Sequence, residues 1–570
     1  MTTGKTPSKK KIPKIKELKK PLIIGAIAVV VAIAGIAGGI YVLQETPKGG
    51  TCIIGVDIKW KIVEIDPLTT LWEGAMVTQQ VAETLFDNDF SSEESKISYT
   101  LATDYTWNDN ATELTCSLRQ GVKFHDGTPF NAEAVKWNFD RMYHLVNTTL
   151  GSMVFSFGYL VILPDGRWIV NETQVIDEYT VKFVLNEPFV PFLQLLTHSA
   201  TSILSPTSTV FDEILNFLTD DIVGTGPFIY DEYILDVEIK LSPNPSYWGG
   251  KPKIDGIIIR YYDTTDDLWN AFLAQNVTFL LPVQTSSFFI YFPNKSIEML
   301  INDPKITVQE SLGTNFRYIG MNNININVTM RKAISHAFNY SILTEEWPII
   351  SMRVRSPIPE GIIYSNTTAF NIPNYNISLA RQTLLDANWP GTAGLSANNN
   401  VSAGNEWETL VSNDTSLETY NISYWAANAI LSFIAPIVRE NLRQIGISVN
   451  LIGSDMKHWA NHLFISGWLY DYNDPHSALY PLYSSKSSDN MVYGSHLNDS
   501  LVDQWIEEAA KDTNPVTRKE TYYKIQERLI EELYVSAWTF TSKTIDIYDS
   551  NLRGWQPNPL KYLYKTVYFV

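Results

Sequence analysis

The chain has 570 residues, of which 45% are hydrophobic, and it carries a net charge of −18 at pH 7. A chain of this length exceeds one ordinary domain, so we expect two or three domains with separate cores. The acidic balance argues against nucleic acid and anionic lipid as partners of the main body, and two cysteines are too few for a disulfide framework or a cysteine-based metal site.

The first fifty residues combine a basic tail with an uncharged segment. Residues 1–20 carry eight lysines and one glutamate, so residues 21–570 carry a net charge of −25. Residues 22–43 contain no charged residue, and an apolar run of this length spans a hydrocarbon core as a helix. Lysines on its amino side place that side in the cytoplasm. We therefore expect a basic cytoplasmic tail over 1–20, a single transmembrane anchor over 21–43, and the bulk of the chain outside the cell.

Two alternatives to a retained anchor stay open. Ala32-Ile33-Ala34 has the small-x-small form that a signal peptidase accepts, and cleavage there would release the main body. Cys52 follows the segment, where a lipid-modified cysteine would provide a different anchor. The residues before it, Gly49-Gly50-Thr51, lack the apolar residue of a lipobox.

Residues 118–141, LRQGVKFHDGTPFNAEAVKWNFDR, predict a strand, a tight turn and an amphipathic helix. Val122 and Phe124 alternate with polar neighbours, as in a half-buried strand, and Asp126-Gly127 is a tight-turn dipeptide. Asn131 is placed to cap a helix that begins at the next residue. One face of that helix is apolar, through Val135, Phe139, Met142 and Val146.

Both cysteines precede this segment. Cys116 shares a strand face with Leu118, which predicts a thiol in the core. A single bridge between Cys52 and Cys116 stays open, because the expected compartment is oxidising.

Short motifs flank and follow this run in a fixed order. They are LATDYTW at 101–107, GTGPF at 224–228, NPSYWGGKP at 244–252, the segment from MN to HA at 321–337, the segment from PNY to W at 373–389, and GWLYDYNDP at 467–475.

Together with residues 118–141, these motifs resemble the extracytoplasmic solute-binding proteins of family 5, which serve oligopeptide, dipeptide and nickel ABC importers. The resemblance covers residues 51–570. It implies an α/β, bilobed periplasmic-binding-protein-like fold of the large three-domain type II variety, with the ligand in an interlobe cleft. It also implies a monomer that works with ABC permease subunits, that is not an enzyme and that holds no cofactor or metal.

The same resemblance implies a division of the chain into lobes. Lobe I is expected to combine residues 51–87, 196–312 and 533–570, with an extra domain over 88–195, and lobe II is expected over 313–532. The chain crossings between the lobes, near 311–315 and 534–536, would form the hinge.

The predicted ligand site centres on Asp471. It stands between Trp468 and Tyr472, and a carboxylate among large aromatic side chains needs a partner. In peptide binders that the chain resembles, the matching aspartate holds the peptide's α-ammonium group and the matching tryptophan walls the pocket; the alternative is that Asp471 caps a turn or meets an internal arginine. Trp459 resembles a second pocket tryptophan, although it stands closer to Trp468 than in peptide binders. Asp474, before Pro475, is expected to serve the turn.

Other functions find less support in the sequence. The chain has no Gly-x-Ser-x-Gly elbow, no phosphate-binding loop and no dinucleotide fingerprint, and His458 with His462 lack the glutamate of a zinc protease motif. We therefore expect a binding protein for short peptides, with oligosaccharides or a non-transport role at the cell surface as alternatives.

Thirteen Asn-x-Ser/Thr sequons suit a glycosylated surface protein and, with the anchor, favour an archaeal source. They stand at Asn110, Asn147, Asn171, Asn276, Asn294, Asn327, Asn339, Asn366, Asn376, Asn400, Asn413, Asn421 and Asn498.

Overall fold

A computed structural model describes residues 48–69, 72–90, 96–150, 161–163, 167–216, 218–280, 299–348, 351–366, 368–413, 418–454, 462–491, 494–561 and 563–570. Residues 48–570 form one compact unit. Within the described ranges, no helix is long and apolar enough to cross a membrane. The predicted tail and anchor, residues 1–43, and Trp459 lie outside these ranges, so both stay predictions.

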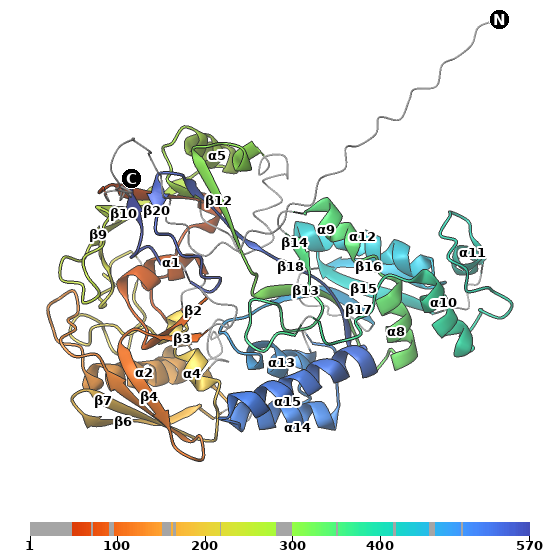
Figure 1. Cartoon of the computed structure of the whole chain (residues 1–570), viewed down its shortest axis with the longest axis horizontal. Coiled ribbons are helices and arrows are strands. Elements are labelled where there is room, and N and C mark those ends of the chain that lie inside the picture. The colour runs from red at the N-terminus through yellow and green to blue at the C-terminus, as the bar shows by residue number, and fades with distance from the viewer. Residues whose placement is uncertain are drawn as a thin grey trace, which may run out of the picture. The chain divides into compact units, whose positions relative to one another are not determined.

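A seven-stranded mixed sheet forms the core of the first body, which we call lobe I (Figure 1). Its strands, in spatial order, are β12 (Ile306–Ser311), β19 (Thr544–Asp549), β11 (Phe279–Leu280), β1 (Thr51–Asp57), β10 (Gly256–Tyr262), β9 (Glu238–Pro243) and β8 (Phe228–Ile234). Two helices accompany it, α1 (Trp72–Val81) and α5 (Thr265–Leu273). Alternate residues of β10 point into one core, which is why Ile257, Ile259 and Tyr261 are buried. All seven strands lie within residues 51–57, 228–311 and 544–549; the division of the chain into the expected lobes stays a prediction.

A four-stranded antiparallel sheet builds the predicted extra domain. It runs β4 (Ala102–Trp107), β5 (Glu113–Leu118), β7 (Thr180–Leu185) and β6 (Val170–Asp177), and it is accompanied by α2 (Ala132–Leu145) and the short α4 (Phe192–Leu195). The Asn131 side chain accepts a hydrogen bond from the Ala134 amide at 3.0 Å, which confirms the predicted cap. Val135, Phe139, Met142 and Val146 are all buried, as expected of the apolar face.

The expected strand through Val122 and Phe124 is wrong. Both side chains are buried, but the segment makes only an isolated bridge between Lys123 and Pro129. The physical reason is that the Phe124 amide bonds to the Thr128 carbonyl across the tight turn, which closes the segment on itself.

A six-stranded sheet forms the core of the second body, lobe II. Its order is β14 (Ser351–Arg353), β18 (Ser536–Ser542), β13 (Asn315–Met321), β17 (Leu463–Leu469), β15 (Thr419–Trp425) and β16 (Ser448–Ser454). Both faces of the sheet are covered, because along β13 Phe316 and Tyr318 enter one core whereas Ile319 and Met321 enter the other.

Helices of lobe II belong to one or other of these two cores (Figure 1). The Ile319 core takes α8 (Val328–Ala337), α9 (Ser341–Glu346), α10 (Ile377–Asp386), α11 (Glu406–Asn413) and α12 (Ala429–Arg443). The Phe316 core takes α13 (His476–Tyr483), α14 (Ser500–Lys511) and α15 (Pro515–Glu527). Two small two-stranded sheets complete the fold, β2 (Phe86–Asp89) with β3 (Lys96–Tyr99) and β20 (Leu552–Arg553) with β21 (Tyr568–Phe569).

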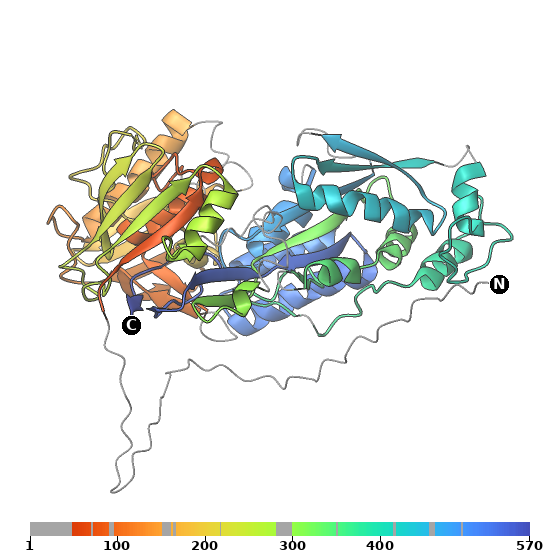
Figure 2. The same cartoon turned by 90° about the horizontal axis from the view of Figure 1, so that it is seen from above.

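The chain crosses between the two large sheets at two adjacent points. Residues 312–314 join β12 to β13, and Lys543 joins β18 to β19, the long blue strands of Figure 2. The first crossing lies where it was expected. The second lies later than 534–536, because β18 pairs with β13 and so belongs to the sheet of lobe II.

Close backbone contact ties the crossings together. A Cβ atom on Gly313 would lie 1.9 Å from the Ser542 carbonyl oxygen, so only glycine fits. The Asn315 carboxamide accepts from the Ser542 amide at 3.2 Å and donates to its carbonyl at 3.4 Å.

Both cysteines are buried and free. Cys116 is a core thiol, as predicted, and the possible bridge to Cys52 does not form. Cys52 lies inside strand β1 with no exposed surface, which leaves no room for a lipid on its sulfur. Burial raises the pKa of the Cys52 thiol to about 12, so it stays protonated and unreactive at neutral pH.

Candidate ligand cleft

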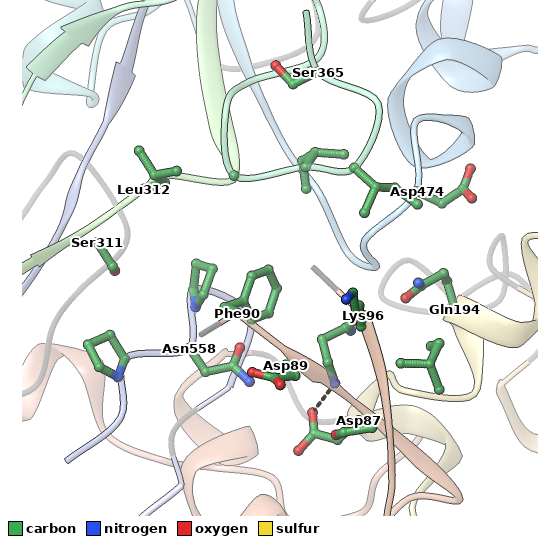
Figure 3. A pocket seen from close by; sticks show the side chains of 18 of the residues that line it. Asp87, Asp89, Phe90, Lys96, Gln194, Ser311, Leu312, Ser365, Asp474 and Asn558 are labelled. Carbon is green, nitrogen blue, oxygen red and sulfur yellow. Dashed lines mark hydrogen bonds between the residues drawn. The ribbon is translucent and has the colours of Figure 1, made fainter. Parts of the chain in front are cut away.

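A cavity of about 1720 Å³ is bounded by lobe I, lobe II and both chain crossings, and we call it the interlobe cleft. Lobe I contributes Asp87 and the loop 555–566, and the extra domain contributes residues 88–90, β3 and Gln194. Lobe II contributes residues 360–365, Asp474 and the start of α15. The crossings contribute residues 309–312 and Lys543. Figure 3 shows these groups converging from both sides.

A buried ion pair stabilises the floor of the interlobe cleft on the side of lobe I. Lys561 lies 3.3 Å from Asp87 and also reaches the Thr84 hydroxyl at 3.0 Å. Burial lowers the pKa of Lys561, while the Asp87 carboxylate acts in the opposite direction. The pair fixes β2, so that Asp87, Asn88 and Asp89 face the cleft.

The C-terminal loop forms the adjoining wall. The Trp555 indole donates to Asp546 at 2.8 Å and packs against Phe279 and Tyr564, at centroid distances of 4.7 and 5.0 Å. Burial raises the pKa of Asp546 to about 7. Sequence reasoning missed this wall; the stiff Gln556-Pro557-Asn558-Pro559 segment was the available signal.

On the side of lobe II, Asp474 and Arg518 form a buried ion pair at 2.6 Å. Asp474 also accepts from the Tyr522 hydroxyl at 3.0 Å and from the His476 amide at 2.9 Å. Burial by itself lowers the pKa of Arg518, but the Asp474 carboxylate outweighs it, so the net pKa is raised. Asp474 therefore stabilises the turn, as predicted, through its bond to the His476 amide. It also pairs with an internal arginine, a role that the sequence had offered for Asp471.

The predicted site residues meet around the start of α13. The Trp468 indole donates to the Ser477 carbonyl at 2.9 Å, and the Asp471 amide donates to the Ser477 hydroxyl at 3.2 Å. Tyr472 is 4% exposed, packs into the core of the extra domain and shares a 3.2 Å hydrogen bond with His476 Nδ1. None of the three lines the interlobe cleft as the structure has it, so their contact with ligand stays a prediction.

Comparison with known proteins settles the family. The family model described as "Bacterial extracellular solute-binding proteins, family 5 Middle" matches residues 96–490. The chain belongs to solute-binding protein family 5. The Escherichia coli K12 glutathione-binding protein GsiB is 26% identical over 502 residues, which is 84% of this chain and 87% of that protein.

Solved structures share the bilobed family 5 fold. HbpA2 from Haemophilus parasuis matches with a TM-score of 0.73 at 20% identity, over 91% of this chain and 100% of that one. DppA from Helicobacter pylori, solved with the peptide STSA, matches with a TM-score of 0.67 at 20% identity, over 92% and 98%. The fold class predicted from the sequence is therefore confirmed.

Two of the family 5 motifs, GTGPF and NPSYWGGKP, build the scaffold of lobe I. In the GTGPF motif, a Cβ atom on Gly224 or Gly226 would come within 2.4 Å of a backbone carbonyl at the end of α1. The buried Glu83 carboxylate accepts from the Tyr247 hydroxyl at 2.6 Å and the Trp248 indole at 2.7 Å, and both donors belong to the NPSYWGGKP motif. Burial raises the pKa of Glu83, and these hydrogen bonds oppose the rise.

A third connection joins the extra domain to lobe II. The Val190 amide donates to the Ala510 carbonyl at 2.7 Å, and the Phe189 ring stands edge-on to His476 at 5.0 Å. Asn473, fully buried, donates to Asn88 at 3.5 Å. These contacts connect the extra domain and lobe II at a place separate from the two chain crossings.

No metal centre was found among the described residues, where no three His, Cys, Asp or Glu side chains converge. His462 instead lies 3.2 Å from Glu418 and accepts from the Asn421 amide, and His458 falls outside the described ranges.

Proposed function

We propose that this protein is the substrate-binding protein of an ABC importer, which captures short peptides in the interlobe cleft and delivers them to a membrane permease. The charge pattern of the cleft carries the proposal. Five carboxylates line it, at Asp87, Asp89, Glu310, Glu360 and Asp474, and five cationic side chains, at Lys96, Arg518, Lys519, Lys543 and Lys565. Such a balanced lining suits a ligand that carries both charges, as a peptide does.

The size of the cleft supports an oligopeptide. Sites for drug-sized ligands have volumes of about 300–1,000 Å³. A cavity of about 1720 Å³ exceeds that range and leaves room for an extended chain of several residues. The proteins of similar fold include one solved with the peptide STSA.

Within this proposal, Asp471 receives the peptide's α-ammonium group and Trp468, Tyr472 and Trp459 wall its pocket. Asp474 is paired with Arg518 inside the protein, so it is not assigned to the ligand. Movement of lobe II about the two chain crossings would bring these residues to the cleft.

Oligosaccharides are the second candidate, favoured by the aromatic side chains of the cleft. Phe90, Tyr99, Tyr105, Tyr364 and Trp555 line it, and Tyr99 is 45% exposed. Aromatic faces of this kind stack well on sugar rings.

Calorimetry on residues 48–570 separates the two ligands. A peptide should lose affinity by orders of magnitude in Asp471→Asn, because the buried ammonium loses its countercharge, and amino-terminal acetylation of the peptide should act alike. Asp263→Asn, at an exposed carboxylate of lobe I, is the matched control. Peptide binding that survives Asp471→Asn and fails in Trp468→Ala would speak for a sugar-like mode instead.

The N-terminal segment completes the proposal. Residues 21–43 would hold the protein at the cell membrane, with residues 1–20 in the cytoplasm, the remainder outside and its sequons glycosylated. The uncharged run and its lysines support this. Retention in the membrane fraction after carbonate washing is expected, whereas release of a protein beginning near Gly35 would identify a cleaved signal peptide.

A further inference from the structure

A separate cavity of about 480 Å³ lies between the extra domain and lobe II, and we call it the side cavity. It shares no lining residue with the interlobe cleft, although Tyr472, proposed above for the peptide pocket, lines the side cavity. The extra domain contributes Glu187 and Phe189, and lobe II contributes His476, Tyr480, Asp489 and Glu507. Its volume falls within the range of about 300–1,000 Å³ that is typical of small-molecule sites.

Aromatic rings form one wall of the side cavity. His476 stacks on Tyr480 with an interplanar angle of 7° and a centroid distance of 5.2 Å, and the Phe189 ring meets His476 edge-on. Burial lowers the pKa of His476 to about 4. The imidazole is therefore neutral at pH 7, so this wall is flat, apolar and uncharged.

Charged side chains of both signs line the other wall, where Glu187, Asp489 and Glu507 stand with Lys486 and Lys511. Burial raises the pKa of the Tyr480 phenol, and the charges of Glu507, Asp503, Asp489 and Glu187 raise it further. Glu507 is paired with Lys486, and Glu187 with Arg167 at 3.2 Å.

Two polar groups of the side cavity lack a matching partner. Burial raises the pKa of the Asp489 carboxyl, and no described cation pairs with it. The Tyr480 hydroxyl is buried and has no hydrogen-bond partner among the described residues. Buried polar atoms of native proteins nearly always have a partner, so the Tyr480 hydroxyl points to a ligand with a hydrogen-bond donor. Asp489 is only partly buried and lines the same cavity.

We propose that the side cavity binds a small organic cation with an aromatic body, such as an arylalkylammonium ion. Its ring packs against Tyr480, His476 and Phe189, and its ammonium group donates to Asp489 and to the Tyr480 hydroxyl. Because such a ligand touches the extra domain and lobe II together, it stabilises the closed arrangement and, by linkage, strengthens binding in the interlobe cleft.

Calorimetry of the full chain with 2-phenylethylammonium chloride tests this assignment, with 2-phenylethanol as the uncharged probe of similar shape. One saturable site is expected for the cation, and affinity about tenfold lower for the alcohol. Asp489→Asn should weaken the cation to the level of the alcohol. Tyr480→Phe should weaken it less, and Asp263→Asn should leave it unchanged.

The probe must also be shown to avoid the interlobe cleft, which has its own proposed ammonium site. Asp471→Asn should therefore leave binding of 2-phenylethylammonium unchanged. A loss in Asp471→Asn with none in Asp489→Asn would place the probe in the interlobe cleft and overturn the proposal, although peptide import would stand. Absence of saturable binding, or equal affinity for the alcohol, would overturn it as well.

Discussion

Asp474 and Arg518 compensate each other's charge beside the interlobe cleft, and neither is exposed by more than 5%. Removing one member of a buried pair leaves an unpaired charge in a medium that solvates it poorly. Asp471, three residues earlier, is half-buried, and its backbone amide donates a hydrogen bond to the Ser477 hydroxyl. Two aspartates of one short motif thus have different tasks, one structural and one proposed for ligand.

The first prediction concerns this pair. Arg518→Met should lower the free energy of unfolding by about 3–5 kcal/mol, because Asp474 stays buried without its countercharge. Combining it with Asp474→Leu should recover part of the loss. Urea unfolding provides the measurement, and Lys61→Met, at an exposed ion pair with Asp236, is the control that should change little. Equal effects of Arg518→Met and Lys61→Met would contradict the burial argument.

A second prediction at this scale concerns Asp546 under the Trp555 wall. Burial raises its pKa from the ordinary 3.8 to about 7, so the folded state holds a proton that the unfolded state releases between these values. Stability contributed by the neutral carboxyl is therefore full below about pH 4 and is lost as the pH rises through 7. Asp546→Asn stays neutral, keeps an acceptor for the indole and should remove this loss.

The measurement is urea unfolding of both proteins at pH 5 and pH 8. The difference in free energy of unfolding between Asp546→Asn and the natural chain should increase in favour of the variant by a few kcal/mol from pH 5 to pH 8. This is on the order expected for a pKa shift of this size. A difference between the two proteins that does not change with pH would show that the carboxyl ionises normally.

At the scale of elements, the sequence predicted those features that depend on residues close together in the chain. The cap of α2 at Asn131 and its apolar face depend on residues within a few turns of one another, and both were predicted. The strand expected at Val122 and Phe124 failed because alternation alone does not supply a partner strand. The second crossing was misplaced for a related reason, since the assignment of β18 depends on its pairing with the distant β13.

The crossing at Gly313 yields the third prediction. Gly313→Ala would place a Cβ atom 1.9 Å from the Ser542 carbonyl oxygen. Because this contact is with backbone, one of the two chain crossings would have to move to relieve it. We expect a loss of about 1–3 kcal/mol in the free energy of unfolding, together with weaker ligand binding. Leu235→Ala, at a side chain of lobe I that is 61% exposed and does not line the interlobe cleft, is the control. Unchanged unfolding of Gly313→Ala would show that the crossings are not held as tightly as the structure indicates.

At the scale of the whole molecule, family motifs predicted the fold but only part of the cleft. The GTGPF and NPSYWGGKP motifs pack lobe I around Glu83 and the end of α1. Because their role is structural, they predict the fold but not the ligand. The walls of the interlobe cleft come from β2, β3, the loop 555–566 and the start of α15. These segments are far apart in the chain, so only the folded arrangement brings them together. The role of Asp471 in binding stays a prediction.

The fourth prediction concerns closure. Ligand in the interlobe cleft contacts both lobes at once only when they are closed, so it should shift the protein toward that state. Small-angle scattering of residues 48–570 should give a smaller radius of gyration at saturating ligand. Phe189→Ala removes a ring between the extra domain and lobe II, and it should increase the radius of the ligand-free protein. An unchanged radius in both comparisons would argue against a hinge.

Native mass spectrometry of the purified protein tests the central proposal most directly. Binding proteins of high affinity retain their ligand through purification, and a cleft of about 1720 Å³ with balanced charge should retain oligopeptides. The account predicts adducts that dissociate on activation into ions whose fragments are amino acid residues. Adducts made only of hexose units would contradict it and would assign the interlobe cleft to sugars.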